Sequence, residues 1–368
     1  MSERRLSFRE FCDTVQAGIR DYLPDAFRDA EIRTADFRKL NENYVGMTVR
    51  REEQAVVPNI NLNQQYEQYM VNGEDLDQVF RRIAGQVQLH PELDTDWLRD
   101  YEKVKDRLFI RVSNEKENEE FLSNVPHQTV DGLAVTYHVA IDGIHGVNAS
   151  TAVTNDMLEM YGVSKEQLHQ DALDNAREML PARYTSMAAM MMGIASDMGM
   201  DTDMMQESPP GMPMLMVLTN DTGAYGAAAL FYPDKLDEIS SRMHSDFFVL
   251  PSSVHEVLIL PDDGRTDYRD LQMMVQTINA SEVAPADRLS DHVYHYDAKD
   301  HVLEKAETYE HRMELKSRTA EKEKISDRER EPQKGRQSVL QRLNEKKAQV
   351  KVQPKKDVPD RAKGFSID

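Results

Sequence analysis

Four side chains that could perform chemistry fall within five residues of the chain. They lie between two short apolar runs, 247–250 and 257–260, and they are Ser252, Ser253, His255 and Glu256. A nucleophilic serine needs a histidine base within hydrogen-bond reach, and that histidine needs a carboxylate to orient it. The residue types therefore raise a serine hydrolase as one hypothesis.

The spacing of these residues argues against that hypothesis. On a strand, Ser253 and His255 share one face and Glu256 lies on the other, so the orienting acid would come from elsewhere, with Asp291 as a candidate. Serines exposed on sharp turns usually carry flanking glycines, and none flanks this pair. We expect the hydroxyls to bond nearby backbone and His255 to be a satisfied polar residue.

A second cluster of the same kind, Ser290, Asp291 and His292, also stands at the entry to an expected strand. Buried polar groups need partners, and two such clusters could satisfy each other. We predict that His255 and His292 lie on facing or neighbouring strands. Together with Ser252, Ser253 and Asp291 they would close one polar pocket that is structural or holds a ligand.

No stretch indicates a metal or a cofactor. His292 and His295 are three apart on an expected strand, so they point to opposite faces. The segment 187–216 holds 11 of the 21 methionines but no cysteine or histidine, which favours a core or contact surface over a copper site. The glycines at 143 and 146 match neither a P-loop nor a dinucleotide fingerprint.

The elements that position these residues are strands interleaved with helices. The stretch 246–261 predicts two buried strands joined by a tight connection, with Phe248, Leu250, Val257 and Ile259 in the core. Runs 215–219 and 227–232 are also interpreted as strands. Without a regular strand–helix alternation, the order indicates an α+β fold with mixed, largely antiparallel sheets.

Charge divides the chain. Residues 307–368 carry 17 basic and 12 acidic side chains and are basic overall. Residues 1–306 carry 28 basic and 53 acidic side chains and are strongly acidic. Apolar residues also thin out near Glu307, which predicts a charged, disordered or helical tail. We expect a globular body over 1–305, which two subdomains meeting near 180–213 could make up, and a flexible tail over 306–368.

Composition also restricts location and partners. Cys12 is the only cysteine, the N-terminus does not resemble a secretory signal, and no run approaches the roughly 20 apolar residues of a membrane span. We expect a cytoplasmic protein without a membrane partner. An acidic body repels phosphate backbones, so nucleic acid is an unlikely partner except through 332–368. Another protein, bound through the acidic body or the tail, suits the charges better.

Several stretches carry a resemblance to a known family. The sequence 250–257, Leu-Pro-Ser-Ser-Val-His-Glu-Val, is similar to an uncharacterised domain-of-unknown-function family common in gut Firmicutes, family number 5688. So are 61–69, 124–127, 154–163 and 289–294. The likeness spans about residues 5–305 and extends distantly to a smaller Bacillus-type family of unknown function. It implies an unassigned function, often encoded near mobile elements, and supplies no catalytic residues.

The methionine-rich segment and the charged tail depart from that family. We expect a non-enzymatic protein that binds another protein or a small ligand. Two alternatives stay open: a hydrolase-like enzyme using Ser253 and His255, and a nucleic-acid accessory protein acting through its basic tail.

Overall fold

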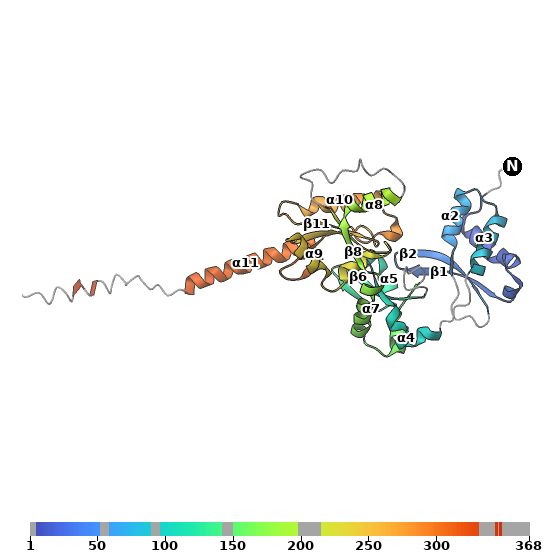
Figure 1. Cartoon of the computed structure of the whole chain (residues 1–368), viewed down its shortest axis with the longest axis horizontal. Coiled ribbons are helices and arrows are strands. Elements are labelled where there is room, and N and C mark those ends of the chain that lie inside the picture. Colours follow the sequence, from blue (N-terminus) through green and yellow to red (C-terminus); the bar gives the residue numbers. More distant parts are fainter. Residues whose placement is uncertain are drawn as a thin grey trace, which may run out of the picture. The chain divides into compact units, whose positions relative to one another are not determined.

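The computed structural model describes residues 5–51, 59–89, 96–141, 150–197, 215–330, 343–344 and 346–347. Contacts divide the chain into two units, Met1–Tyr309 and Glu310–Asp368. The first unit holds every sheet that the described residues form (Figure 1).

The N-terminal part of the first unit is a small sheet covered by helices. Its antiparallel strands are β1 (Glu31–Lys39), β2 (Glu42–Arg50) and β3 (Asn59–Asn61), in that order. Its helices are α1 (Phe8–Gly18), α2 (Leu62–Val71) and α3 (Leu76–Leu89). Ser7 caps α1 through a capping box with Glu10, which satisfies backbone N–H groups that the first turn leaves free. Sheet and helices share one hydrophobic cluster of their own.

Two further antiparallel sheets follow along the chain. The four-stranded sheet consists of β4 (Leu108–Asn114), β5 (His127–Val130), β6 (Leu133–Ala140) and β7 (Ser150–Ala152), with β6 in contact with the other three. The six-stranded sheet has the order β13-β12-β10-β11-β9-β8. Its strands are β8 (Ala182–Ser186), β9 (Met216–Asn220), β10 (Phe247–Leu250), β11 (Val257–Pro261), β12 (Tyr294–Asp297) and β13 (Val302–Lys305).

Helices connect these strands. The α-helices are α4 (Tyr101–Val104), α5 (Glu119–Leu122), α6 (Asn155–Tyr161), α7 (Lys165–Met179), α8 (Met187–Asp197), α9 (Lys235–Met243), α10 (Tyr268–Ser281) and α11 (Ala306–Arg330). The short 3₁₀ helices are η1 (Ile19–Tyr22), η2 (Asp25–Phe27), η3 (Asp96–Arg99), η4 (Lys105–Arg107), η5 (Lys116–Asn118), η6 (Gly226–Phe231) and η7 (Pro285–Asp287). The predicted α+β class with antiparallel sheets and interleaved helices is confirmed.

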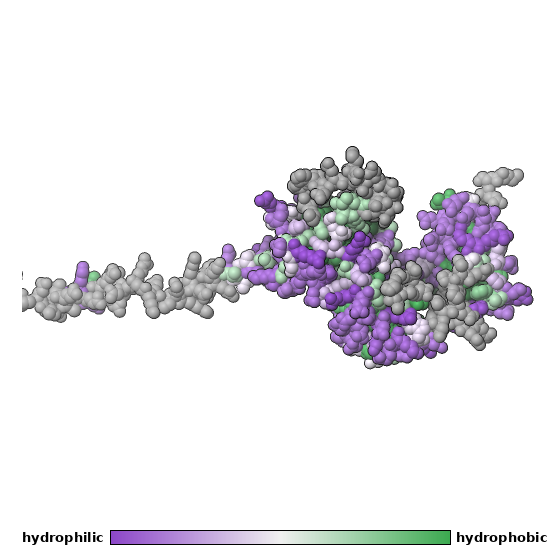
Figure 2. Space-filling model, in the orientation of Figure 1, coloured by the Kyte–Doolittle hydropathy of each residue, from purple (hydrophilic) through white to green (hydrophobic). Residues whose placement is uncertain are grey.

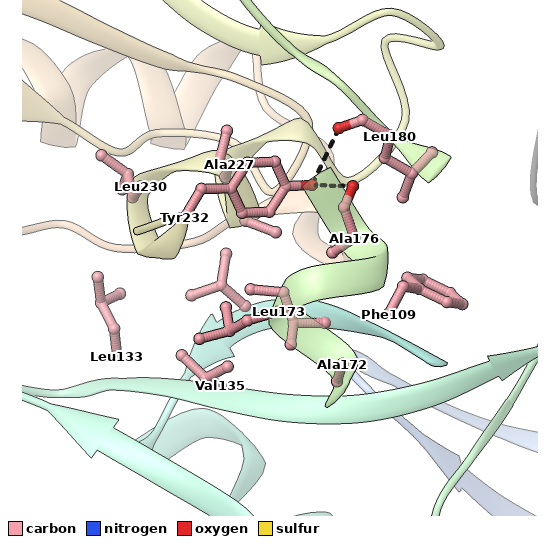
Figure 3. Packing of buried hydrophobic residues seen from close by; sticks show 14 of the residues in the cluster. Phe109, Leu133, Val135, Ala172, Leu173, Ala176, Leu180, Ala227, Leu230 and Tyr232 are labelled. Atoms are coloured by element: carbon pink, nitrogen blue, oxygen red, sulfur yellow. Dashed lines mark hydrogen bonds between the residues drawn. The ribbon is translucent and has the colours of Figure 1, made fainter. Parts of the chain in front are cut away.

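The largest hydrophobic cluster joins both larger sheets to α7 and η6 (Figure 3). Tyr232, at the end of η6, inserts its ring there, and its hydroxyl donates to the carbonyl oxygens of Ala176 at 3.2 Å and Leu180 at 3.0 Å. The Ala176 carbonyl, in the last turn of α7, also accepts from the Leu180 N–H, and Leu180 is the residue that caps the helix. The cluster draws on residues before and after 180–213, so the hydrophobic core does not divide there.

The two strands predicted within 246–261 form a hairpin. β10 pairs with β11 from Phe247 opposite Pro261 to Leu250 opposite Leu258. The four residues predicted for the core, Phe248, Leu250, Val257 and Ile259, are all buried. This burial confirms the prediction. Two short apolar runs on either side of a turn are typical of a buried hairpin.

One strand prediction is wrong. Residues 227–232 were expected to be extended, but 226–231 form the 3₁₀ helix η6. The Gly-Ala-Ala-Ala run is buried on all sides, and a short apolar run without alternation does not distinguish a strand from a buried helical turn. Most of the methionine-rich segment 187–216 lies outside the described residues.

The surface is largely hydrophilic on the face drawn in Figure 2. Among the described residues, no helix combines the length and apolar character needed to cross a membrane.

Limited proteolysis should separate the two units. We expect trypsin to leave a resistant fragment ending near Lys305 and to cut readily beyond residue 310, because the first turns of α11 after Tyr309 are almost entirely exposed and rich in Lys and Arg. Mass spectrometry of the fragments measures the boundary. A resistant fragment that extends past residue 330 would contradict it.

Candidate functional site

The connection between β10 and β11 is fixed by a second segment of the chain. Backbone N–H groups of Val254, Leu289 and Ser290 donate to the carbonyls of Asp287, Ser252 and Pro251, at 2.8, 3.3 and 2.9 Å respectively. An isolated bridge joins Ser253 to Arg288. The segments 251–254 and 287–290 therefore run antiparallel.

His255 has an acidic partner, and it is Asp287. The His255 Nε2 lies 3.1 Å from Asp287 Oδ1, and the backbone N–H of Tyr225 donates to His255 Nδ1 at 3.2 Å. Nδ1 is thus an acceptor, and Nε2 carries the proton donated to Asp287. Asp291 does not fill the orienting role considered for it, because its Oδ1 accepts from Asn279 Nδ2 at 2.7 Å.

The serines bond locally. Ser253 Oγ accepts from the backbone N–H of His255 at 3.0 Å. Burial raises the pKa of the Glu256 carboxyl, while His255 and a hydrogen bond to Ser253 partly oppose that rise. No hydrogen bond in the described part of the chain joins a serine hydroxyl to the His255 ring. The pairing that a serine nucleophile requires is therefore not formed.

His292 has different neighbours. Its backbone N–H donates to Ser290 Oγ at 3.0 Å, and its Nδ1 lies 3.6 Å from Glu307 Oε1. The strands that follow the two histidines, β11 and β12, both pair with β10 but on opposite sides. Within the described residues no side-chain hydrogen bond connects the two clusters. A single pocket closed by both histidines stays a prediction.

A cavity of about 830 Å³ opens beside His255. Its walls come from the β1–β2 turn, the four-stranded sheet, the end of α5 and the segments near 225, 254 and 287. The residues used below are Arg38, Lys39, Glu42, Arg111, Glu120, Asn124, His138, Ala152, Thr154, Tyr225 and Asp287. We call it the Arg111 cavity.

Arg111 is the unusual residue of this cavity. Its guanidinium lies 3.6 Å from the centroid of the Tyr225 ring, and its Nη2 donates to Ser150 Oγ at 2.8 Å. Its Nε is buried and finds no hydrogen-bond partner among the residues that the structure describes. Among the described residues no carboxylate forms an ion pair with it, and burial lowers the pKa of the guanidinium. A cation held away from water without an acid is costly and so points to a function.

His138, which lies on β6 two residues beyond the partner of Arg111, is kept neutral. His138 is 4% exposed, and its Nε2 lies 3.0 Å from Thr136 Oγ1. Burial, reinforced by the charge of Arg111, holds the pKa of His138 well below its usual value. Arg111 thus keeps the only charge of this pair at neutral pH.

Tyr225 connects the two features. Its backbone is left-handed, with φ of 55°, a conformation that bulky residues rarely adopt without a compensating contact. The compensation includes the hydrogen bond to His255 and the stacking of its ring over Arg111. The His255–Asp287 pair therefore positions Tyr225, and Tyr225 positions Arg111.

The β1–β2 turn is fastened where it borders the cavity. Asn41 and Asn118 exchange two hydrogen bonds at 2.6 and 2.7 Å, and Asn41 Nδ2 donates to the carbonyl of Arg288 at 3.1 Å. Asn41 has φ of 60°, which asparagine tolerates better than most residues. These bonds join the turn to η5 and to the segment before Leu289.

Arg111 and Asp287 were missed in the sequence. Asp287 carried no local signal. Arg111 did carry one, because it is the only charged residue in the apolar run Leu-Phe-Ile-Arg-Val at 108–112. A charge within a strand that is otherwise buried calls for a partner or a ligand.

A second histidine pair lies at the far end of the hairpin. His295 is fully buried, and its Nε2 lies 3.0 Å from Asp262 Oδ2. This hydrogen bond lowers the pKa of the Asp262 carboxyl, and a bond from the Gly264 N–H adds to the effect against the opposing effect of burial.

Asp262 should make stability depend on acid. A carboxyl whose pKa is lower in the folded state contributes stability above its unfolded pKa of about 3.9, and the contribution is lost as pH falls through the folded pKa. We therefore expect Asp262→Asn to destabilise the protein at neutral pH and the difference from wild type to shrink below about pH 4. Urea unfolding across this range measures it, with exposed Asp270→Asn as the control. An unchanged difference at acid pH would contradict the expectation.

No group of three or more His, Cys, Asp or Glu side chains within the described ranges is arranged to hold a metal ion. Comparison with curated proteins and with solved structures finds no significant match. A profile described as a family of unknown function, DUF5688, matches residues 8–298, which is most of the chain. The two histidine clusters, the cavity and the hairpin all lie in or at the border of the matched region, and the protein belongs to this family.

Proposed function

We propose that the protein is a non-enzymatic ligand-binding protein whose small ligand occupies the Arg111 cavity. The observation that carries the proposal is the cavity itself. Its volume of about 830 Å³ falls within the range of small-molecule sites, roughly 300–1,000 Å³. Its lining mixes apolar residues such as Leu40, Phe121 and Val125 with a larger number of polar and charged side chains contributed by several segments.

A cavity-filling substitution tests the proposal. Ala152 on β7 lines the cavity, so Ala152→Trp should block it, whereas Ala280→Trp places the same side chain on an exposed position of α10. The protein, purified from its host under native conditions, is analysed by native mass spectrometry and by metabolite extraction. We expect a small molecule with wild type and Ala280→Trp but not with Ala152→Trp. Equal recovery from all three proteins would exclude the cavity.

The hydrolase alternative has its own test. A fluorophosphonate probe labels serines activated by a base. We expect it to label neither Ser252 nor Ser253, since Ser253 Oγ bonds backbone and His255 Nε2 points to Asp287. Labelling that disappears in His255→Ala would replace the ligand-binding proposal with a hydrolase.

Other parts of the function stay proposals. The acidic body and the basic tail favour a protein partner in the cytoplasm, and 332–368 is the segment through which nucleic acid would bind. An origin in Firmicutes and an association with mobile elements are expectations from the family resemblance alone.

A further inference from the structure

We propose that the ligand of the Arg111 cavity is a small molecule with one oxyanion group, a carboxylate or a phosphate ester, bound by the Arg111 guanidinium. The inference rests on the proposed function and names the chemical class of its ligand.

The first argument is the missing acid. Removing a guanidinium from water is unfavourable unless an anion or a full set of hydrogen bonds replaces the water. Ser150 Oγ satisfies one donor group of Arg111 and the Tyr225 ring covers one face, but no residue in the described part of the chain bonds to Nε. A neutral His138 beside it offers no negative charge. An oxyanion would supply what the described residues do not.

The second argument is that the other charges of the cavity are occupied. Arg38 forms an ion pair with Glu120, Asp287 bonds to His255, and Glu42 accepts from Asn61 Nδ2 at 2.7 Å. Lys39 is exposed and lies over the ring of Tyr44, with 5.3 Å from its Nζ to the ring centroid.

The lining carries three cations, Arg38, Lys39 and Arg111, and three carboxylates, Glu42, Glu120 and Asp287, so its formal charges balance without pairing one to one. Arg111 is the half-buried cation of this lining, with a buried Nε, for which the described residues provide no acid. The lining therefore fits one anionic group. A polyanion would also meet the carboxylates of Glu42, Glu120 and Asp287, which line the same cavity and would repel its further negative charges.

The third argument is rigidity. An arginine fork binds a carboxylate or a phosphate with two parallel hydrogen bonds only if its plane is fixed. Tyr225 stacks on this plane, and the left-handed Tyr225 is in turn held by His255. Asn124 and Thr154 line the same cavity and can bond the remainder of the ligand.

Matched acids and amides provide the experiment. The full-length protein is titrated with pairs of equal shape, such as 4-hydroxybenzoate with 4-hydroxybenzamide, and with glycerol 3-phosphate. Affinities come from calorimetry, and the Arg111 Nε resonance is followed in ¹⁵N-arginine-labelled protein. We expect the oxyanion to bind about 10- to 100-fold more tightly than its amide and to shift this resonance. A carboxylate ligand and a phosphate ligand are distinguished by which arm binds.

Variants of Arg111 distinguish a failure of the oxyanion proposal from a failure of the ligand-binding proposal. Arg111→Met should abolish the preference for the acid while leaving the amide affinity unchanged, and Arg111→Lys should retain only part of it because lysine cannot bind bidentately. Circular dichroism verifies folding. If the acid and the amide bind equally well, and Ala152→Trp blocks both while Arg111→Met changes neither, the oxyanion proposal is overturned and the ligand-binding function is kept.

One control addresses a residue outside the described ranges. Asp142→Asn is measured without any ligand. If the Arg111 Nε resonance shifts in this variant, the guanidinium already has an acid and the proposal is overturned. The proposal is also overturned if neither a carboxylate nor a phosphate shifts this resonance in the wild-type protein.

Discussion

Replacing Phe248 with alanine is expected to lower the free energy of unfolding by about 3–5 kcal/mol, the range for truncating a buried phenylalanine. Phe248 is 5% exposed in the central strand β10, and its ring meets that of His295 edge to face at a centroid distance of 5.1 Å. It packs in a cluster with Leu250 from its own strand and Leu271 and Val275 from α10. The truncation therefore leaves a cavity between the sheet and α10 that neither element can easily fill.

Urea unfolding of the variant measures the loss. Met273→Ala on α10 is the control, because Met273 is 60% exposed and its truncation should cost less than about 0.5 kcal/mol. A loss below about 1 kcal/mol for Phe248→Ala would mean that α10 does not pack on this face of the sheet.

Gly226→Ala is expected to damage both stability and ligand binding. A Cβ at Gly226 would lie 2.2 Å from Thr219 Oγ1, 2.5 Å from the carbonyl oxygen of His255 and 2.7 Å from the backbone nitrogen of Asn220. Two of these atoms are backbone and cannot rotate away. We expect a loss of about 1–3 kcal/mol, as for other overpacked sites. Because Tyr225 precedes this glycine, its ring should also lose its position over Arg111.

Gly85→Ala provides a control with the opposite sign. Gly85 lies in α3, and nothing approaches within 4 Å of the position of its added Cβ. Alanine is the better helix former, so this change should stabilise the protein by about 0.5–1 kcal/mol. Thermal melts of both variants, together with calorimetry for the Gly226 variant, measure these effects. A Gly226→Ala protein with wild-type stability and affinity would show that the turn after Tyr225 does not hold the cavity wall.

The sequence by itself determined the features that depend on local pattern. Two short apolar runs on either side of Pro251 predicted the β10–β11 hairpin and its buried residues correctly, since a strand hidden on both faces needs continuous apolar side chains. Ser7 and the apolar residues at helical spacing after it encode α1 in the same local way. The change in charge near Glu307 predicted a different character for the end of the chain.

The tertiary structure alone decided which polar residues meet. His255 pairs with Asp287 and not with Asp291, four residues further on, because β-bridging between 253 and 288 sets the register of the two segments. No local pattern encodes that register. Arg111 lies more than a hundred residues from Tyr225 in sequence, and only the packing of the two sheets brings the ring over the guanidinium. Long-range contacts such as these arise from the summed burial of many side chains, so a single sequence shows the charge but not what surrounds it.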